Sequence, residues 1–158
     1  MDQLNPFLAR HKENADFNQY WYSKATIGFL VSECEQFGNK FDQKFAKDPN
    51  FVFYDFNKPE DISKEFEKYF DMVVIDPPFI TREVWEKYSE AAKFLVKDGG
   101  KILLSTIDEN EPFIMELLGA SKRAFRPSIP NLVYQYSLYS NYDSEGLNNK
   151  NPEIPEFD

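Results

Sequence analysis

Residues 70–75 form a short, almost continuous apolar run that is followed directly by Asp76-Pro77-Pro78-Phe79. Such a run predicts a β-strand that is covered on both faces of a parallel sheet. The two prolines have no N–H and a fixed φ, so strand pairing must stop where they begin. We therefore expect the strand to end in a rigid turn whose carbonyl groups remain free to accept hydrogen bonds.

The side chains of this turn favour chemistry at an amine. An amino group donates two hydrogen bonds, and two acceptors can aim its lone pair in one direction. Asp76 supplies a carboxylate acceptor, the carbonyls beside the prolines supply others, and Phe79 supplies a flat apolar wall. The candidate catalytic residues are therefore Asp76, Pro77, Pro78 and Phe79. The simpler alternative is a Pro-Pro turn after a core strand, with an incidental Asp.

The composition indicates a single soluble domain. The chain has 158 residues, and its 16 Phe and 9 Tyr supply ample material for one hydrophobic core. A single cysteine, Cys34, excludes an internal disulfide and fits a reducing compartment. No stretch is long and apolar enough to span a membrane, and residues 1–12 lack the apolar segment of a signal peptide. We therefore expect a cytoplasmic protein.

The charge and the scarcity of metal ligands exclude other classes of function. The formal net charge is −9, and Lys and Arg are scattered rather than clustered. Binding to nucleic acid depends on neutralising phosphates, so the sequence favours a basic or neutral partner instead. One histidine, His11, and one cysteine cannot assemble a metal site.

Periodicity along the chain predicts alternating helices and strands. The predicted helices span residues 16–37, 63–69, 81–97 and 111–118, and the predicted strands span residues 51–54, 70–75, 101–106, 123–126 and 132–141. This order is typical of a doubly wound α/β sheet that closes with an antiparallel hairpin. Ligands bind such sheets beyond the carboxyl ends of the strands, which is where we expect Asp55 and Asp76.

The polar ends of the chain set the predicted domain bounds. Residues 1–14 form a polar N-terminal segment, residues 15–143 the α/β domain, and residues 144–158 a polar tail that we expect to be disordered. Within the domain, apolar and polar residues alternate over residues 132–138, which predicts that the last strand is half-exposed.

Five separate segments, in order along the chain, resemble one family. They are Phe17 to Ser23, Phe41 to Phe45, Phe51 to Pro59, Asp76 to Phe79 and Asn141 to Asp143. Together they resemble the eukaryotic protein-lysine methyltransferases that act on translation elongation factor 1-alpha. That family was formerly labelled N6-adenine-specific DNA methyltransferase-like because of its Asp-Pro-Pro-aromatic motif. The resemblance implies a class I, Rossmann-like methyltransferase fold that uses S-adenosylmethionine.

By position, the resemblance also implies three groups of site residues. The target amine is held by the turn that begins at Asp76, and aromatic side chains close the substrate pocket. Acidic and aromatic side chains hold the ribose and adenine of the cofactor. The implied substrate-binding residues are Tyr20, Trp21 and Tyr22, and the implied cofactor-binding residues are Asp42, Asp55 and Phe56.

Each implied role has a simpler alternative. Asp42 fits a loop acid, and Asp55 fits a cap of the turn formed by residues 57–59. Trp21 and its aromatic neighbours fit the apolar face of a core helix. The residues alone do not choose between these alternatives.

The chain departs from the family at one place. The family pattern has a strand, a cofactor-binding loop and a helix before the segment that corresponds to residues 41–45. Here Gly38-Asn39-Lys40 leads straight into that segment. We therefore expect one central strand and its loop to be missing. An adenine-amino methyltransferase that acts on nucleic acid, and a methyltransferase-fold binding protein without catalysis, are the alternative functions.

Overall fold

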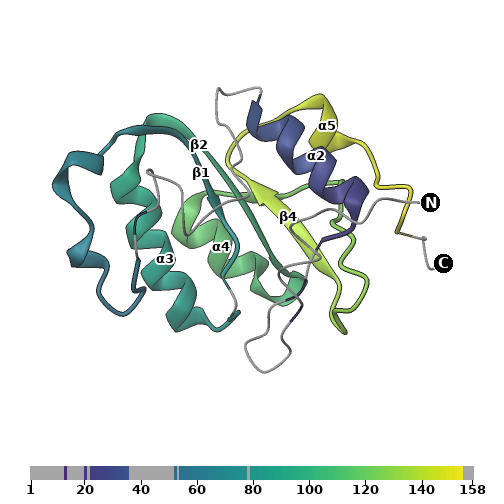
Figure 1. The fold of residues 1–158 in the computed structure, drawn as a ribbon, viewed down its shortest axis with the longest axis horizontal. Coiled ribbons are helices and arrows are strands. Elements are labelled where there is room, and N and C mark those ends of the chain that lie inside the picture. The colour runs from purple at the N-terminus through teal and green to yellow at the C-terminus, as the bar shows by residue number, and fades with distance from the viewer. Residues whose placement is uncertain are drawn as a thin grey trace.

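The computed structural model describes residues 13, 20, 22–35, 52, 54–77 and 79–154. They form a mixed α/β structure around one four-stranded sheet of order β1-β2-β4-β3 (Figure 1). The strands are β1 (Phe70–Ile75), β2 (Val96–Ile107), β3 (Ser121–Lys122) and β4 (Tyr136–Ser140). Strands β1 and β2 are parallel, whereas β4 is antiparallel to β2 and to β3. The predicted α/β class with antiparallel C-terminal strands is confirmed.

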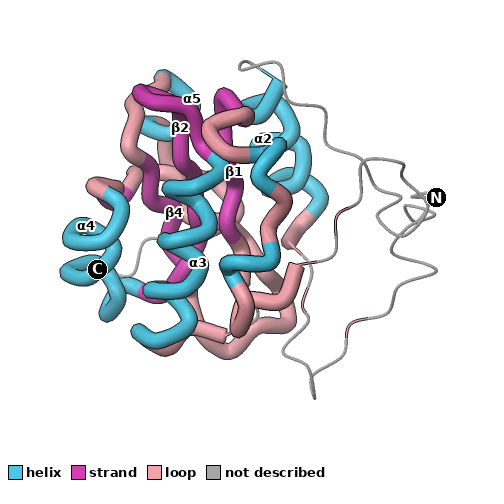
Figure 2. Tube along the Cα trace, turned by 90° about the vertical axis from the view of Figure 1, so that its left-hand side faces the viewer, coloured by secondary structure: helices cyan, strands magenta, loops and turns pink. Residues whose placement is uncertain are grey.

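Helices cover both faces of this sheet. Helices α3 (Arg82–Leu95) and α4 (Glu111–Leu118) lie on one face, and Figure 2 shows α3 in front of the strands. Helices α2 (Lys24–Glu35) and α5 (Glu145–Asn148) lie on the other face. A hydrophobic core lies on each face of the sheet, and successive residues of β2 point into one core and then the other. Leu104 packs with Trp85 of α3, whereas Leu103 packs with Leu147 of α5.

The central elements follow the local sequence closely. Strand β1 has the predicted bounds. Helix α3 begins after Thr81, whose hydroxyl accepts a hydrogen bond from the Val84 amide at 3.4 Å, as expected for an N-cap. Helix α4 also has the predicted bounds and ends at Gly119, which has the left-handed φ of 61° that glycine adopts without strain.

Strand β2 begins five residues earlier than predicted, at Val96. Val96 pairs with Phe70, whereas Lys101 pairs with Met72, so extra residues of β2 lie opposite a short stretch of β1. Gly99, with a φ of 74°, provides the backbone conformation for this irregularity. The Gly-Gly sequence therefore lies within an irregular strand instead of ending the helix.

The last strand differs from the prediction in length and exposure. Strand β4 has five residues, all of them buried, because it lies between β2 and β3 with helices on both faces of the sheet. Tyr134, which was predicted to lie in this strand, is 64% exposed in the loop before it. The alternation over residues 132–138 therefore does not report a half-exposed strand.

The N-terminal elements also differ. Helix α2 begins at Lys24, whereas Tyr20 and Tyr22 are not helical. The Ser23 hydroxyl accepts a hydrogen bond from the Thr26 amide at 3.1 Å, so Ser23 caps the helix. The described residues of the predicted strand over 51–54 are not in a strand.

Two short 3-10 helices, Pro59–Asp61 and Lys64–Phe66, precede β1 in place of the single helix that the sequence predicts over residues 63–69.

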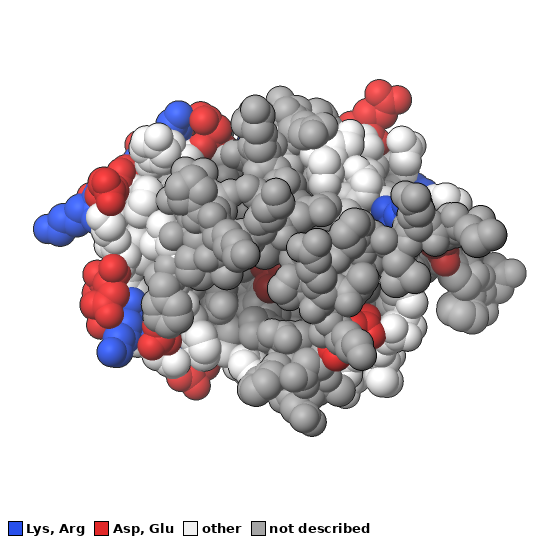
Figure 3. Space-filling model, viewed as in Figure 1, with Lys and Arg blue, Asp and Glu red and all other residues white. Residues whose placement is uncertain are grey.

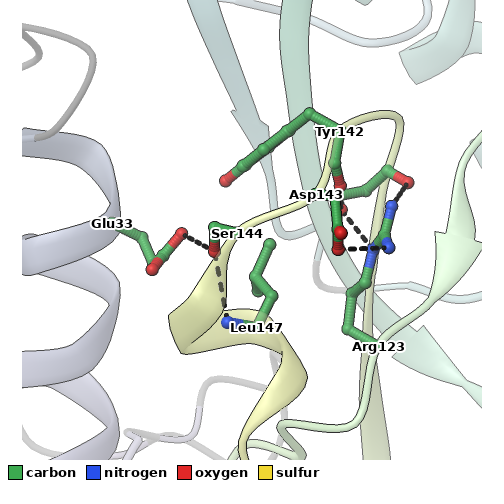
Figure 4. A network of polar contacts seen from close by, with 7 residues as sticks. Glu33, Arg123, Tyr142, Asp143, Ser144 and Leu147 are labelled. Carbon is green, nitrogen blue, oxygen red and sulfur yellow. Dashed lines mark hydrogen bonds and ion pairs between the residues drawn. The ribbon is translucent and has the colours of Figure 1, made fainter.

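Residues 144–154, which were expected to be disordered, pack against the domain. Leu147 of α5 is fully buried, and the Ser144 hydroxyl donates a hydrogen bond to the Glu33 carboxylate at 2.9 Å (Figure 4). The buried Asn151 amide donates to the Arg126 carbonyl at 2.8 Å. The prediction failed because a polar segment with a single well-placed apolar residue can still dock onto a preformed core.

Within the described residues, β1 is an edge strand that pairs with β2 alone. Its Val74 is 47% exposed, on the face where α2 lies, so the prediction that both faces are covered holds only in part. An edge at β1 is the arrangement expected if the missing central strand is one that would pair there. No helix in the described ranges has the length and apolar character needed to cross a membrane.

Candidate functional site

The site lies where β1 ends beside β2. The parallel register pairs Ile75 with Leu104, so the next residues, Asp76 and Ser105, are also neighbours. The Ser105 hydroxyl donates a hydrogen bond to Asp76 Oδ1 at 2.6 Å. Ser105 is buried, whereas Asp76 keeps part of its surface exposed to solvent. Strand pairing thus presents an accessible carboxylate on a rigid support.

The hydroxyl of Tyr22 completes this arrangement from a distant part of the chain. Tyr22 precedes α2, and its hydroxyl lies 2.7 Å from Ser105 Oγ. A serine hydroxyl has one hydrogen to donate, and an ionised carboxylate can only accept. Because the Ser105 hydrogen is directed at Asp76, Tyr22 must donate to Ser105. The result is a one-way chain of hydrogen bonds from Tyr22 through Ser105 to Asp76.

The protein environment changes the protonation equilibria of these groups. Burial raises the pKa of Asp76, although the Ser105 hydrogen bond and the nearby Tyr22 hydroxyl act in the opposite direction. The surrounding protein therefore limits the hydration of the Asp76 carboxylate, although part of the residue is exposed to solvent. Burial and the Asp76 charge raise the pKa values of Tyr22 and of Tyr88, so both phenols stay protonated near neutral pH.

The turn after Asp76 is anchored at its far end. Asn110, which is buried, donates one hydrogen bond from Nδ2 to the Ile80 carbonyl and another to the Thr106 hydroxyl, both at 2.9 Å. Pro77 is buried, but Phe79 is 48% exposed. A large aromatic residue that closely follows Asp76 in the sequence and is left exposed is suited to contact a substrate rather than the core.

A second group of aromatic side chains lies beside α3. The Phe56 and Tyr88 rings stack at 6.0 Å with an interplanar angle of 20°, and Tyr54 meets Tyr88 edge-on at 5.6 Å. The Lys87 ammonium lies 5.5 Å from the centre of the Phe56 ring. Burial and the Asp76 charge raise the pKa of Tyr88, so this aromatic group lies within electrostatic reach of the carboxylate.

The Asp55 carboxylate is engaged locally. Its Oδ1 accepts hydrogen bonds from the backbone amide of Asn57 at 2.9 Å and from the Asn57 side chain at 3.3 Å. This is the turn-capping role that the sequence offered as the simpler alternative. Asp55 does not follow a strand in the described residues, so its expected position at a strand end is wrong.

Of the other predicted site residues, only some belong to the part of the chain that the structure describes. Tyr20 is half-buried in irregular structure, and Trp21, Asp42 and Pro78 lie outside the described residues. Among the described residues, no group of three or more His, Cys, Asp or Glu side chains is arranged to hold a metal ion.

Sequence reasoning missed Ser105, Tyr88 and Asn110. One signal for Ser105 was present: it is the first hydroxyl residue after Ile102-Leu103-Leu104, near the carboxyl end of the second parallel strand. Polar residues at that point face the ligand side of a doubly wound sheet. Tyr88 and Asn110 lie on elements whose orientation only the folded chain determines.

The visible surface carries charges of both signs. Acidic and basic side chains alternate along the margin on the side of α3 (Figure 3). Ion pairs among the described residues include Arg82 with Glu86 at 2.8 Å and Lys97 with Asp71 at 2.7 Å. A cation held in such an ion pair is less available to a phosphate backbone.

Comparisons with known proteins identify relatives over most of the chain. A family described as probable N6-adenine methyltransferase matches residues 39–144. The chain is 32% identical to EEF1A lysine methyltransferase 1 of Homo sapiens over 166 aligned positions, and the alignment covers 84% of this chain and 77% of the relative. It is 35% identical to the protein of the same name from Bos taurus, with 84% and 73% covered. A protein-lysine N-methyltransferase of Caenorhabditis elegans is 31% identical over 110 residues, with 69% and 50% covered.

The human relative has residues with no counterpart in this chain. Because 84% of 158 residues is about 133 residues, about 33 of the 166 aligned positions are occupied in the relative alone. The family match begins at residue 39, directly after Gly38, where the sequence predicts the missing strand and loop. The edge position of β1 agrees with that prediction.

Proposed function

The chain belongs to the methyltransferase family described as probable N6-adenine methyltransferase, and on that premise we propose that it transfers a methyl group from S-adenosylmethionine to a lysine amine of a protein. The observation that carries this proposal is the Asp76 carboxylate at the end of β1, held by Ser105 and followed three residues later by the exposed Phe79. This arrangement offers an acceptor and an apolar wall to one amine.

The residues of the site act on the amine in two ways. A lysine amine has a pKa of about 10.4 in water and must lose a proton before it can attack a methyl group. Aromatic surface from Phe79 and Tyr22 lowers that pKa by reducing hydration of the ammonium. Asp76 favours the ammonium, so its contribution is to orient the amine through a hydrogen bond while the proton leaves to water. Positioning then supplies most of the rate acceleration.

Three described residues are suited to the cofactor, which supplies an electrophilic methyl group on a sulfonium when bound. Phe56 offers an aromatic face to the adenine, and Asp55 lies next to it. The buried Tyr54 hydroxyl has no hydrogen-bond partner in the described part of the chain, and burial raises its pKa to about 12. A ribose or adenine acceptor would satisfy that hydroxyl. The family resemblance adds Asp42 as a ribose contact.

The substrate that we propose is translation elongation factor 1-alpha. Two relatives are named for lysine methylation of EEF1A, and the net charge of −9 suits a basic protein surface. A cytoplasmic location would bring the chain together with that substrate.

Two other functions remain candidates, each on one observation. The description of the family favours methylation of an adenine amino group, with Phe79 stacking on an extruded base. The positions missing relative to the human protein favour a binding protein that retains the fold without catalysis. The charge of −9 and the paired cations weigh against the first of these.

The test is methylation of purified elongation factor 1-alpha by the purified chain with isotope-labelled S-adenosylmethionine, read by peptide mass spectrometry. We expect label on a lysine, and we expect Asp76→Ala to abolish it while the variant stays folded. Asp71→Ala, an exposed acid on the same strand, is the matched control and should keep activity. Label on an adenine-containing oligonucleotide instead would support the adenine reading.

Calorimetric titration with S-adenosylmethionine separates an enzyme from a binding protein. Binding tighter than about 100 μM, or about −5.5 kcal/mol, would support a working cofactor site. Tyr54→Phe should weaken it if the Tyr54 hydroxyl contacts the cofactor. A folded chain that binds elongation factor 1-alpha but not the cofactor would overturn the catalytic proposal.

A further inference from the structure

The buried hydroxyl of Ser105 stands between two polar side chains of the site, 2.6 Å from Asp76 Oδ1 and 2.7 Å from the Tyr22 hydroxyl. We propose that Ser105 is a positioning residue that, with Tyr22, holds the Asp76 carboxylate as a fixed hydrogen-bond acceptor for the substrate amine. The role assigned to the amine rests on the proposed function. The hydrogen-bond chain itself does not.

Ser105 is well placed to act as a rigid anchor. Strand β2 has neighbours on both sides, and Ser105 pairs with Leu138 of β4. Residues on a central strand with a buried side chain have little freedom to move, so they hold a partner more accurately than loop residues do. Asp76, by contrast, follows the last residue of an edge strand and is exposed. Without the Ser105 hydrogen bond, its carboxylate would be free to rotate.

Tyr22 is held in place by a separate contact. The amide of the next residue, Ser23, donates a hydrogen bond to the Ser128 carbonyl at 2.6 Å, in the loop that leads to β4. The Tyr22 hydroxyl therefore reaches Ser105 from an anchored segment. Through this contact, the segment before α2 influences a carboxylate at the end of β1.

The protonation state of Asp76 determines whether its carboxyl group only accepts hydrogen bonds or also donates one. An ionised carboxylate accepts hydrogen bonds, whereas a protonated one donates through one of its oxygens. Burial favours the protonated form of Asp76, whereas the Ser105 hydrogen bond and the nearby Tyr22 hydroxyl favour the ionised form. A protonated Asp76 donates through one oxygen and is therefore a weaker acceptor for an amine than the carboxylate. The two hydroxyls therefore counteract part of the effect of burial, which still raises the pKa of Asp76.

The surroundings contribute tyrosines rather than cations. Tyr88 of α3 lies close enough to respond to the Asp76 charge, and Tyr136 of β4 influences Tyr22. In the described part of the chain, no Lys, Arg or His contributes to the pKa shift of Asp76. Hydrogen bonds, and not an ion pair, therefore favour the ionised form of this carboxylate.

The first test reads Asp76 directly. The carboxyl carbon of Asp76 is titrated by NMR in the labelled full chain, and its midpoint is compared among variants. Ser105→Ala should move the midpoint to higher pH, and Tyr22→Phe should move it in the same direction by less. Ser105→Thr, which retains a hydroxyl, should stay near the wild type. Ser89→Ala is the matched control, because Ser89 is equally buried but its hydroxyl has no partner in the described ranges.

The second test uses the methylation reaction. Hydrogen bonds to charged groups contribute enough that Ser105→Ala should lower kcat by about tenfold or more, with a smaller change in KM. Ser105→Thr should recover most of that loss, and Ser89→Ala should cause none. A merely structural role for Ser105 would lower thermal stability without changing the Asp76 midpoint.

The two tests fail separately. If the wild type methylates no substrate, the proposed function is wrong, but the NMR titration still tests the hydrogen-bond chain. If the Asp76 midpoint is the same in wild type and Ser105→Ala, the positioning role is overturned, even in an active enzyme. An unchanged kcat in Ser105→Ala would also overturn it.

Discussion

Gly146 of α5 lies so close to Glu33 of α2 that a Cβ added at position 146 would be 2.5 Å from Glu33 Oε1 and 3.0 Å from the Phe29 ring. Glu33 is 2% exposed and accepts a hydrogen bond from Ser144, so its carboxylate has no simple way to move aside (Figure 4). The close approach explains how a short C-terminal helix can be held tightly against α2.

Gly146→Ala should therefore destabilise the protein. Overpacking of this kind typically costs about 1–3 kcal/mol, and equilibrium unfolding in urea would measure it. Gly28→Ala is the matched control, because Gly28 lies within α2 and an added Cβ there meets nothing within 4 Å. That change should stabilise the helix by about 0.5–1 kcal/mol. Equal effects of the two substitutions would contradict the packing that we describe.

Asn110→Ala should reduce activity by loosening the turn that carries Asp76. The substitution removes both hydrogen bonds from the Asn110 amide and leaves the Ile80 carbonyl unpaired, at a cost of about 1–3 kcal/mol. We expect faster hydrogen exchange over residues 76–80 and a lower kcat. Asn148→Ala, a change at an exposed asparagine of α5, should alter neither. Unchanged exchange in Asn110→Ala would show that the prolines alone hold the turn.

Asp76→Asn should stabilise the folded chain at neutral pH. Burial raises the pKa of Asp76 above its unfolded value, so the folded state prefers the proton and loses stability as pH rises through that range. An amide keeps the acceptor for Ser105 but does not ionise. The variant should melt at a higher temperature than the wild type at pH 7, and the difference should vanish below about pH 4. Activity should fall at the same time, as is common for residues kept for function.

Asp108 should show the opposite dependence on pH. Burial acts to raise its pKa, but hydrogen bonds from Lys122 and Ser137, with the charges of Lys122 and Arg126, lower it below the ordinary value. Its contribution to stability is therefore present above the unfolded pKa and is lost as pH falls through the folded one. Asp108→Asn should cost about 1 kcal/mol or less at pH 7, because the ion pair is partly screened by solvent. Thermal melts at pH 7 and at pH 3 would show the difference shrinking at low pH.

Much of the central architecture could be predicted because its signals are local. Thr81 and Gly119 mark helix ends through hydrogen bonding and backbone conformation that depend on neighbouring residues alone. The same holds for β1, whose composition and following prolines define both of its ends. The failures arose where a distant partner decides the outcome, as at Val96, whose strand pairing begins opposite Phe70.

The sequence by itself determined that an aspartate, two prolines and an aromatic residue follow an apolar strand, because strand composition and proline geometry act over a few residues. The tertiary structure alone decided what Asp76 can do there. Its hydrogen-bond partner Ser105 lies 29 residues away, and the Tyr22 hydroxyl is 83 residues from Ser105. Strand register and burial bring these groups together, and no local pattern encodes which polar side chains will share one poorly hydrated site.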